Sequence, residues 1–113
     1  TRPGVSAGDA VERVRDRLTE DLSAQLSLTE LAAGVGLSPS YLTAVFKAHT
    51  GYSPMQYRTL LRMQRARELL DTSDRSIAEV AREVGYDDVA YFSRRFSSLH
   101  ELGPRAYRRS GRA

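Results

Sequence analysis

The feature that most constrains this chain is an internal repeat that covers most of its length. The segment LTELA at residues 28–32 matches IAEVA at residues 77–81, which lies 49 residues further along. The segment PMQYR at residues 54–58 matches PRAYR at residues 104–108, with a separation of 50 residues. The one-residue change falls in a turn, where insertions are tolerated. The chain is therefore expected to build one structural unit twice.

Each copy of the repeat carries the signals of a helix, a tight turn and a second helix. The sequences SLTE at residues 27–30 and SIAE at residues 76–79 are capping boxes, which open a helix. Gly36 and Gly85 follow, and glycine takes the left-handed conformation that ends a helix. The small Ala32 and Ala81 would let the two helices approach closely. Both copies therefore predict a helix-turn-helix unit.

The same signals predict an all-α chain of about seven helices, since no segment alternates polar and apolar residues for long enough to form a strand. Ser38-Pro39 opens the second helix of the first unit, and Asp87 or Asp88 caps its counterpart. A long central helix joins the two helix-turn-helix lobes. The expected helices cover roughly residues 9–26, 28–35, 39–50, 54–70, 77–84, 88–100 and 104–107.

Apolar spacing predicts which side chains pack inward, with Phe46 and Phe96 as matched anchors of the two lobes. The full set is Val11, Val14, Leu18 and Leu22 on the first helix, Leu42, Val45 and Phe46 in the first unit, Phe92, Phe96 and Leu99 in the second unit, and Tyr57, Leu60, Leu61, Leu69 and Leu70 on the central helix.

The opposite face of the second helix in each unit is small, polar or basic. We call these faces the first stripe, which comprises Ser40, Thr43, Ala44 and Lys47, and the second stripe, which comprises Ala90, Ser93, Arg94 and Ser97. Serine and threonine can hydrogen-bond base edges, alanine can contact a thymine methyl group, and arginine can form two bonds to guanine. These eight residues are the candidate DNA-binding residues.

The charge distribution favours a polyanionic partner such as double-stranded DNA. The net charge is only +3, from 17 basic and 14 acidic residues. Residues 94–113, however, contain six arginines and one glutamate, whereas residues 1–26 contain four basic and five acidic residues. Positive charge gathered in one part of a chain is typical of binding to nucleic acid or an anionic surface.

Other classes of function find little support in the sequence. There is no cysteine, and His49 and His100 lie far apart. No nucleophile–base pair, phosphate-binding glycine loop or metal-ligand cluster is visible, so we expect no enzyme activity, no cofactor and no metal. No apolar run is long enough to cross a bilayer and no signal peptide opens the chain, which predicts a cytoplasmic protein without a membrane partner.

The repeat resembles the AraC/XylS transcription regulators. The resemblance rests on residues 28–47, on the pattern of residues 77–86, on AYFSRRF at residues 90–96 and on residues 104–108. It implies a bacterial, seven-helix, two-lobed DNA-binding domain, usually the C-terminal part of a longer regulator and usually a transcriptional activator. It also implies base contacts from helices at about residues 39–50 and 88–100.

Four residues depart from the family pattern. Ser97 stands where a basic residue is common, Glu101 where glycine is common, and Gly103 where serine or threonine is common. Val89 occupies a position that is frequently polar, so it is open whether it belongs to the core or faces a base. The departures concern phosphate contacts and the end of the sixth helix rather than the fold.

These expectations combine into a domain plan: a linker at residues 1–8, an AraC-type domain at residues 9–109 and a tail at residues 110–113. Within the domain, the helix-turn-helix units cover residues 28–50 and 76–100, and the connecting helix covers residues 54–71. Its expected helical residues, 54–70, span about 25 Å. The reading helices would then lie about one DNA turn, or about 34 Å, apart. A single monomeric domain is thus expected to enter two successive major grooves.

Two other classes of function stay open at this point. The helix-turn-helix surfaces could bind a protein, such as RNA polymerase or an anti-activator. The chain could also be an accessory domain that brings an enzyme to DNA. Salt-dependent binding to a duplex separates DNA recognition from the first alternative, and a longer gene with a catalytic domain would reveal the second.

Overall fold

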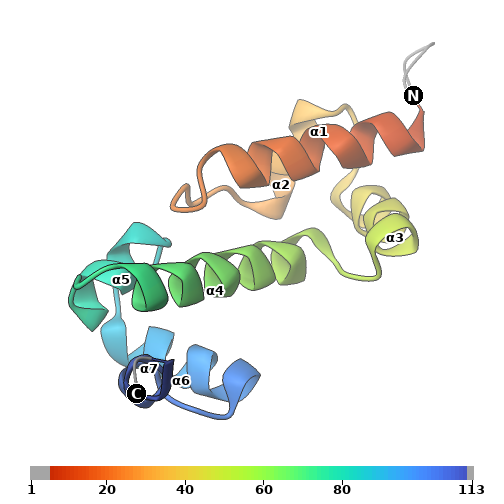
Figure 1. The fold of residues 1–113 in the computed structure, drawn as a ribbon. Coiled ribbons are helices and arrows are strands. Elements are labelled where there is room, and N and C mark those ends of the chain that lie inside the picture. Colours follow the sequence, from red (N-terminus) through yellow and green to blue (C-terminus); the bar gives the residue numbers. More distant parts are fainter. Residues whose placement is uncertain (1–5, 112–113) are drawn as a thin grey trace. The chain divides into compact units, whose positions relative to one another are not determined.

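Seven α-helices make up most of residues 6–111, which are the residues that the computed structural model of the protein describes (Figure 1). This part of the chain contains no β-strand, and the all-α prediction is confirmed. Residues 1–5 of the expected linker and residues 112–113 of the expected tail lie outside the described residues. The helices are α1 (Ala7–Glu20), α2 (Leu28–Gly34), α3 (Pro39–Thr50), α4 (Pro54–Thr72), α5 (Ile77–Glu83), α6 (Val89–His100) and α7 (Pro104–Gly111).

The two expected capping boxes are present at the starts of α2 and α5. The Ser27 hydroxyl accepts a hydrogen bond from the amide of Glu30 at 3.0 Å, and the Ser76 hydroxyl accepts one from the amide of Glu79 at 3.1 Å. Each glutamate carboxylate accepts a bond in return from the amide of its serine, at 3.2 and 3.0 Å. The sequence therefore sets both helix starts through the same local interaction.

The turn between the two helices of each unit is also repeated. Gly36 and Gly85 have φ angles of 70° and 104°, in the left-handed region. The amide that follows each glycine donates back to a buried alanine carbonyl, with a distance of 3.0 Å at Ala32 and 2.8 Å at Ala81. This pattern is a Schellman motif, which satisfies carbonyl groups at the helix end. The prediction that these glycines end helices is confirmed.

The helices α3 and α6, which follow the two turns, are also capped by side chains close to their first residues. The side chains of Ser38 and Asp88 accept from the amides of Tyr41 and Tyr91, both at 3.1 Å. Of the two aspartates that could have capped α6, Asp88 is the one that does.

The first helix differs from the prediction at both ends: it begins at Ala7, inside the expected linker, and it ends at Glu20 and not at Leu26. Asp21 takes an extended conformation, and its carboxylate accepts from the amide and the hydroxyl of Ser23, at 3.1 and 2.7 Å. A short polar side chain that bonds the following backbone in this way competes with helix continuation. Leu22 therefore lies half-buried in a turn instead of continuing the apolar stripe.

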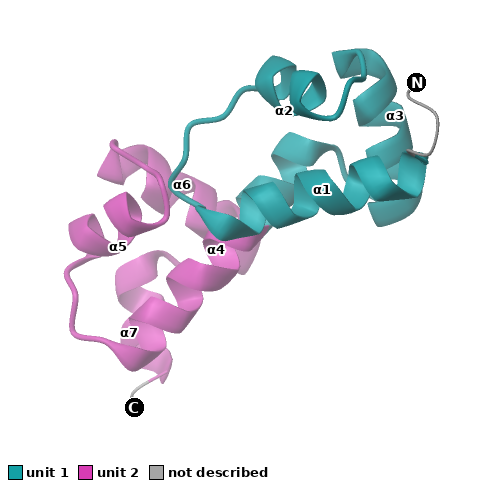
Figure 2. Cartoon of the chain, turned by 90° about the horizontal axis from the view of Figure 1, so that it is seen from above, with its two compact units in different colours: residues 1–60 teal, residues 61–113 magenta. Residues whose placement is uncertain are grey.

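The helices group into two compact units, residues 1–60 and 61–113 (Figure 2). The boundary falls within α4, so the first turns of α4 belong to unit 1 and the remainder belongs to unit 2. In unit 1, α3 contacts both α1 and α2, and in unit 2, α6 contacts both α5 and α7. Each unit therefore has its own set of packed helices around its helix-turn-helix.

Phe46 is the centre of the core of unit 1. It is fully buried, and its ring packs edge-on against Tyr57 with a centroid distance of 5.3 Å. The Tyr57 hydroxyl accepts a hydrogen bond from Arg15 Nε at 3.2 Å, which ties α4 to α1. The other buried apolar side chains of this unit include Val11, Val14, Leu18, Leu31, Ala32 and Leu42.

Phe96 plays the same part in unit 2. It is fully buried and packs edge-on against Tyr107 with a centroid distance of 5.4 Å. The Tyr107 hydroxyl lies 3.4 Å from Asp71 Oδ2, and burial, together with the carboxylate, raises the pKa of this tyrosine. The prediction of matched core phenylalanines is confirmed. The remaining core of this unit comprises Met63, Ala66, Leu69, Leu70, Val80, Ala81, Val84, Tyr86 and Phe92, with Ile77 and Val89 packed against it.

The prediction that Leu60 and Leu99 pack into the core is wrong. Leu60 and Leu99 are 37% and 42% exposed, respectively. Leu99 lies three residues after the buried Phe96, and the rings of His100 and Tyr107 pack against Phe96 instead. The buried apolar residues of α4 that follow Leu60 are Met63, Ala66, Leu69 and Leu70. The last helix also extends beyond Tyr107, to Gly111.

Candidate nucleic-acid interface

The first stripe lies on the face of α3 that is turned away from the core. Ser40, Ala44 and Lys47 are exposed, and Thr43 is half-buried. The Thr43 hydroxyl donates to the carbonyl of Pro39 at 2.9 Å, and this bond leaves its oxygen able to accept another. The buried Leu42 and Phe46 hold this face outward.

The second stripe repeats this arrangement on α6. Ala90, Arg94 and Ser97 are exposed, and Ser93 is half-buried. The pattern of three exposed residues and one half-buried residue is therefore the same as in the first stripe, 50 positions earlier. The structure keeps the four residues of each stripe on one helix face, with the second residue of each stripe closest to the core.

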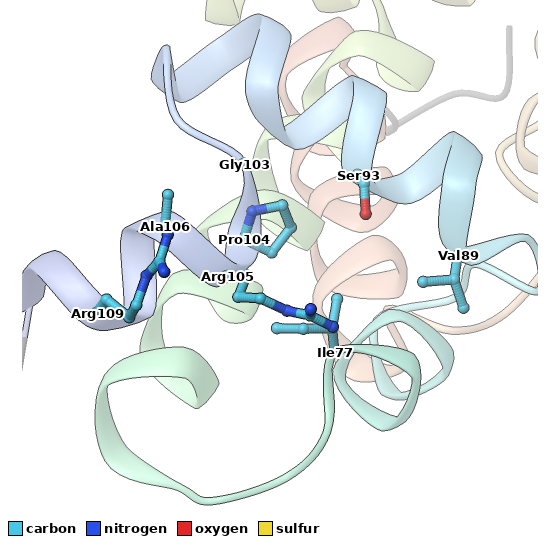
Figure 3. Close-up of a pocket in the computed structure, with 8 residues that line it drawn as sticks. All are labelled: Ile77, Val89, Ser93, Gly103, Pro104, Arg105, Ala106 and Arg109. Carbon is cyan, nitrogen blue, oxygen red and sulfur yellow. The ribbon is translucent and has the colours of Figure 1, made fainter.

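A pocket of about 400 Å³ adjoins the second stripe at Ser93 (Figure 3). It lies among α5, α6 and α7, and Arg105 and Arg109 are its charged residues. None of the described residues that line it is acidic. Among residues 6–111 neither arginine forms an ion pair with another side chain. The remaining lining residues are Ile77, Val89, Gly103, Pro104 and Ala106.

Arg105 and Arg109 were not among the predicted site residues. Their signal was the arginine excess at the C-terminal end, but the sequence alone did not show which of those arginines would adjoin the second stripe. Val89, which could have been core or base-facing, is partly buried against the core and also lines this pocket.

A second pocket, of about 440 Å³, has balanced charges. Arg75, Glu79, Arg82 and Glu83 line it, and Arg75 pairs with Glu83 at 3.0 Å. Hydrogen bonds from Ser76 also lower the pKa of the Glu79 carboxyl group, which favours its charged form. This pocket therefore offers an anion much less attraction than the one beside Ser93.

Three arginines of α4 interact with other groups of the protein. Arg58 Nη1 donates to the carbonyl of Leu26 at 2.8 Å. Arg62 is 4% exposed, and its guanidinium lies over the ring of Tyr86 at 5.4 Å from the centroid. Arg65 pairs with Glu68 at 3.0 Å. Of these three arginines, Arg65 is the one whose partner can be exchanged at the surface for solvent or a phosphate.

The two histidines, His49 and His100, each lie close to a backbone carbonyl of their own helix. Within the described residues there is no group of three or more histidine or acidic side chains suited to a metal ion. His49 Nδ1 lies 2.9 Å from the carbonyl oxygen of Val45, and His100 Nδ1 lies 3.1 Å from that of Phe96. Burial lowers the pKa of His100, and the positive charge of Arg67 lowers it further.

None of the described helices has the length and hydrophobicity needed to span a membrane.

Comparison with known proteins agrees with this geometry. A family model described as a helix-turn-helix domain matches residues 31–110. The chain is 46% identical over 91 residues to the MmsAB operon regulatory protein of Pseudomonas aeruginosa, covering 80% of this chain and 30% of that protein. It is 34% identical over 100 residues to the arabinose operon regulatory protein of Escherichia coli, covering 88% of this chain and 33% of that protein. The chain thus spans about a third of the length of these relatives.

Solved structures give the same result. The C-terminal domain of AraT, a response regulator from Geobacillus stearothermophilus, has a TM-score of 0.87 at 34% identity, covering 95% of this chain and 88% of that one. The DNA-binding domain of AdpA, a global transcriptional factor crystallised with a target DNA, has a TM-score of 0.87 at 30% identity, covering 91% of this chain and 93% of that one.

The fold and these similarities define the chain as a double helix-turn-helix domain of the DNA-binding class. With the family match over residues 31–110, it belongs to the AraC/XylS family of DNA-binding transcription regulators.

Proposed function

We propose that this chain recognises a specific sequence in double-stranded DNA and thereby regulates transcription, with the first stripe reading one half-site and the second stripe reading the next. The observation that carries this proposal is the matched exposure of the two stripes on equivalent helices, α3 and α6. Both faces combine small side chains with hydroxyl groups and one basic residue, and these are the groups that can read base edges in a major groove.

The second stripe provides the strongest base contact in this proposal. Arg94 is exposed at its centre, and the planar guanidinium of arginine can donate two hydrogen bonds to guanine. Ala90, Ser93 and Ser97 are small enough to let α6 sit deep in the major groove. On α3 the corresponding roles belong to the first stripe, which comprises Ser40, Thr43, Ala44 and Lys47. Lys47 is its cationic residue.

Arg105 and Arg109 supply the phosphate contact that Ser97 cannot. The pocket beside Ser93 is cationic and has no acidic lining, so a backbone phosphate next to the second half-site would meet favourable charge there. A serine at position 97 removes a positive charge that relatives in the family commonly have. The two arginines on α7 restore positive charge beside the same stripe.

A single chain carries both stripes, so the proposed site is one asymmetric stretch of about two DNA turns. The continuous helix α4 contributes residues to both units and would fix the spacing of the half-sites. No second copy of the chain is needed for this mode of binding, which agrees with a monomeric domain.

The experiment that tests this mode uses the duplex that the chain selects from a random library. Inserting about five base pairs between its halves would carry the second groove to the opposite face of the duplex. We expect the affinity to fall toward that of one half-site, and insertion of a full turn should not restore it. Tight binding by the monomer after the half-turn insertion would contradict the fixed-spacing mode.

We also infer an activating role, with RNA polymerase as a further partner and the bacterial cytoplasm as the location. A relative that is 30% identical over 98 residues is the lactose operon transcription activator of Staphylococcus xylosus. Transcription in vitro from a promoter that carries the selected duplex tests this role, since an activator raises transcript yield and a repressor lowers it.

A further inference from the structure

Four side chains of unit 2 form a continuous row of contacts that runs from the core to the second stripe. The guanidinium of Arg62 lies over Tyr86, 5.4 Å from the ring centroid. The rings of Tyr86 and Tyr91 are 5.9 Å apart. The guanidinium of Arg94 lies over Tyr91, 6.0 Å from its centroid. A cation within about 6 Å of an aromatic centroid is attracted by the ring.

The inner end of this row of contacts is held firmly. Arg62 and Tyr86 are only 4% and 8% exposed. Tyr86 also packs against the fully buried Phe92, with the ring centroids 5.5 Å apart. Buried side chains that touch several neighbours have few alternative rotamers, so Tyr86 offers Tyr91 a fixed surface.

The outer end consists of Tyr91 and Arg94. Tyr91 is 46% exposed, and Arg94 lies three residues later on the same helix. Within residues 6–111 Arg94 forms no ion pair and no side-chain hydrogen bond. Among the described residues, the ring of Tyr91 is therefore the group with which this guanidinium makes a specific contact.

We propose that Tyr91 is a positioning residue that sets the sequence specificity of the second stripe by holding Arg94 in its base-reading conformation. An arginine side chain loses much rotamer freedom when it binds, and its two-bond recognition of guanine depends on the orientation of the planar group. Holding the group in advance reduces that loss. This inference rests on the proposed function, because it assigns Arg94 to a base.

Unit 1 contains a natural control for this role. Tyr41 stands 50 residues before Tyr91 and is similarly exposed, at 50%. Ala44 stands where the second unit has Arg94, so Tyr41 has no equivalent arginine to orient. A general role for an exposed tyrosine at this helix position would apply to both residues, whereas the positioning role applies only to Tyr91.

The test measures discrimination, defined as the ratio of affinities for the duplex selected by the wild-type chain and for a scrambled duplex of equal length. Tyr91→Leu should lower this ratio about 2- to 5-fold, the effect expected for loss of an exposed cation–aromatic contact. Tyr91→Phe keeps the ring and should keep the ratio, and Tyr41→Leu should also leave it unchanged. An equal loss in Tyr41→Leu would overturn the proposal, as would an equal loss in Tyr91→Phe, which would assign the effect to the hydroxyl.

A double-mutant cycle makes the test specific to Arg94. In the Arg94→Ala background, Tyr91→Leu should cause no further loss of discrimination, because there is no guanidinium left to position. If Tyr91→Leu keeps its full effect in that background, Tyr91 acts on DNA independently and the positioning role is wrong.

A measurement without DNA separates this inference from the proposed function. The side-chain protons of Arg94 should show an upfield ring-current shift by NMR in the wild-type chain and in Tyr91→Phe, and the shift should disappear in Tyr91→Leu. Absence of the shift in the wild type would overturn the positioning role even if the chain discriminates between duplexes. Equal affinity of the wild type for the two duplexes would overturn the proposed function and, with it, the role of Arg94.

Discussion

Gly51 and Glu101 occupy the same backbone position in the two repeats, and both have left-handed φ angles, 86° and 65°. Each is the residue that ends its stripe-bearing helix, and each donates its amide to a carbonyl four residues earlier, at 2.8 Å in both cases. Glu101 is the one residue other than glycine with positive φ within residues 6–111. The second repeat therefore uses a strained residue where the first uses glycine.

Glu101→Gly should stabilise the protein. An L-residue in the left-handed region costs about 1–2 kcal/mol, part of which glycine loses again through its greater freedom in the unfolded chain. We expect a gain of about 1 kcal/mol in the free energy of unfolding, measured by chemical denaturation. The reverse change, Gly51→Glu, should cost about as much, and a neutral or destabilising Glu101→Gly would show that the helix end is not strained.

Gly85→Ala should destabilise the chain more than Gly36→Ala, although both glycines have positive φ. A Cβ added at Gly85 would lie 2.7 Å from Cζ of the buried Arg62, whereas one at Gly36 would meet nothing within 4 Å. The expected difference is about 1–3 kcal/mol, the usual range for overpacking. Thermal unfolding of the two variants side by side measures this difference, and equal losses would mean that Arg62 moves aside freely.

Phe96→Ala should cost about 3–5 kcal/mol, since it removes a fully buried ring from the core of unit 2. Leu99→Ala is the matched control on the same helix. Because Leu99 is 42% exposed, its loss should cost well under half as much. Denaturant unfolding of both variants checks the inner face of α6, and a larger loss for Leu99→Ala would show that this face is assigned wrongly.

The stability of unit 2 should depend on pH through His100. Burial against Phe96, whose ring centroid is 4.2 Å away, lowers the pKa of His100 below its ordinary value of 6.5. The unfolded chain therefore binds a proton at a higher pH than the folded chain does. The free energy of unfolding should consequently fall as the pH drops from about 6.5 toward the lowered pKa, and it should level off above this window.

His100→Thr removes this titration, and the first repeat already shows how threonine fits at the equivalent position. Thr50, the counterpart of His100, donates its hydroxyl to the carbonyl of Phe46 at 2.8 Å, so threonine at position 100 can bond Phe96 in the same way. Comparing the unfolding of the two proteins at about pH 5 and about pH 7.5 isolates the histidine. The same pH dependence in both proteins would show that His100 does not cause it.

Most of the fold was readable from the sequence because its determinants are local. Ser27 and Ser76 bond amides three residues away, and Gly36 and Gly85 act within their own turns. The predictions were wrong where a distant or competing interaction determines the structure. Spacing alone predicted that the apolar face of α1 continues to Leu22, but the hydrogen bonds from Ser23 to Asp21 end this helix earlier. Leu99 fits the helical period, but the rings of His100 and Tyr107 fill the space beside Phe96.

The same distinction applies to the candidate site. The stripes follow from helical spacing once Phe46 and Phe96 define the inner face. The pocket that includes Arg105 and Arg109 depends on how α7 packs beside α6, and no local pattern specifies this. The burial of Arg62 likewise depends on Tyr86, which lies 24 residues further along the chain.

The central claim is that the two stripes read two separate half-sites on one duplex. Selection from a random duplex library, followed by sequencing, tests it most directly when it is run with the wild-type chain, Lys47→Ala and Arg94→Ala. We predict two blocks of base preference about one DNA turn apart in the wild type. Arg94→Ala should erase the preference at one position of one block, at a cost of about 1–3 kcal/mol on the selected site, and Lys47→Ala should affect only the other block. A single block of preference, or an equal loss of affinity on every sequence in Arg94→Ala, would contradict the claim.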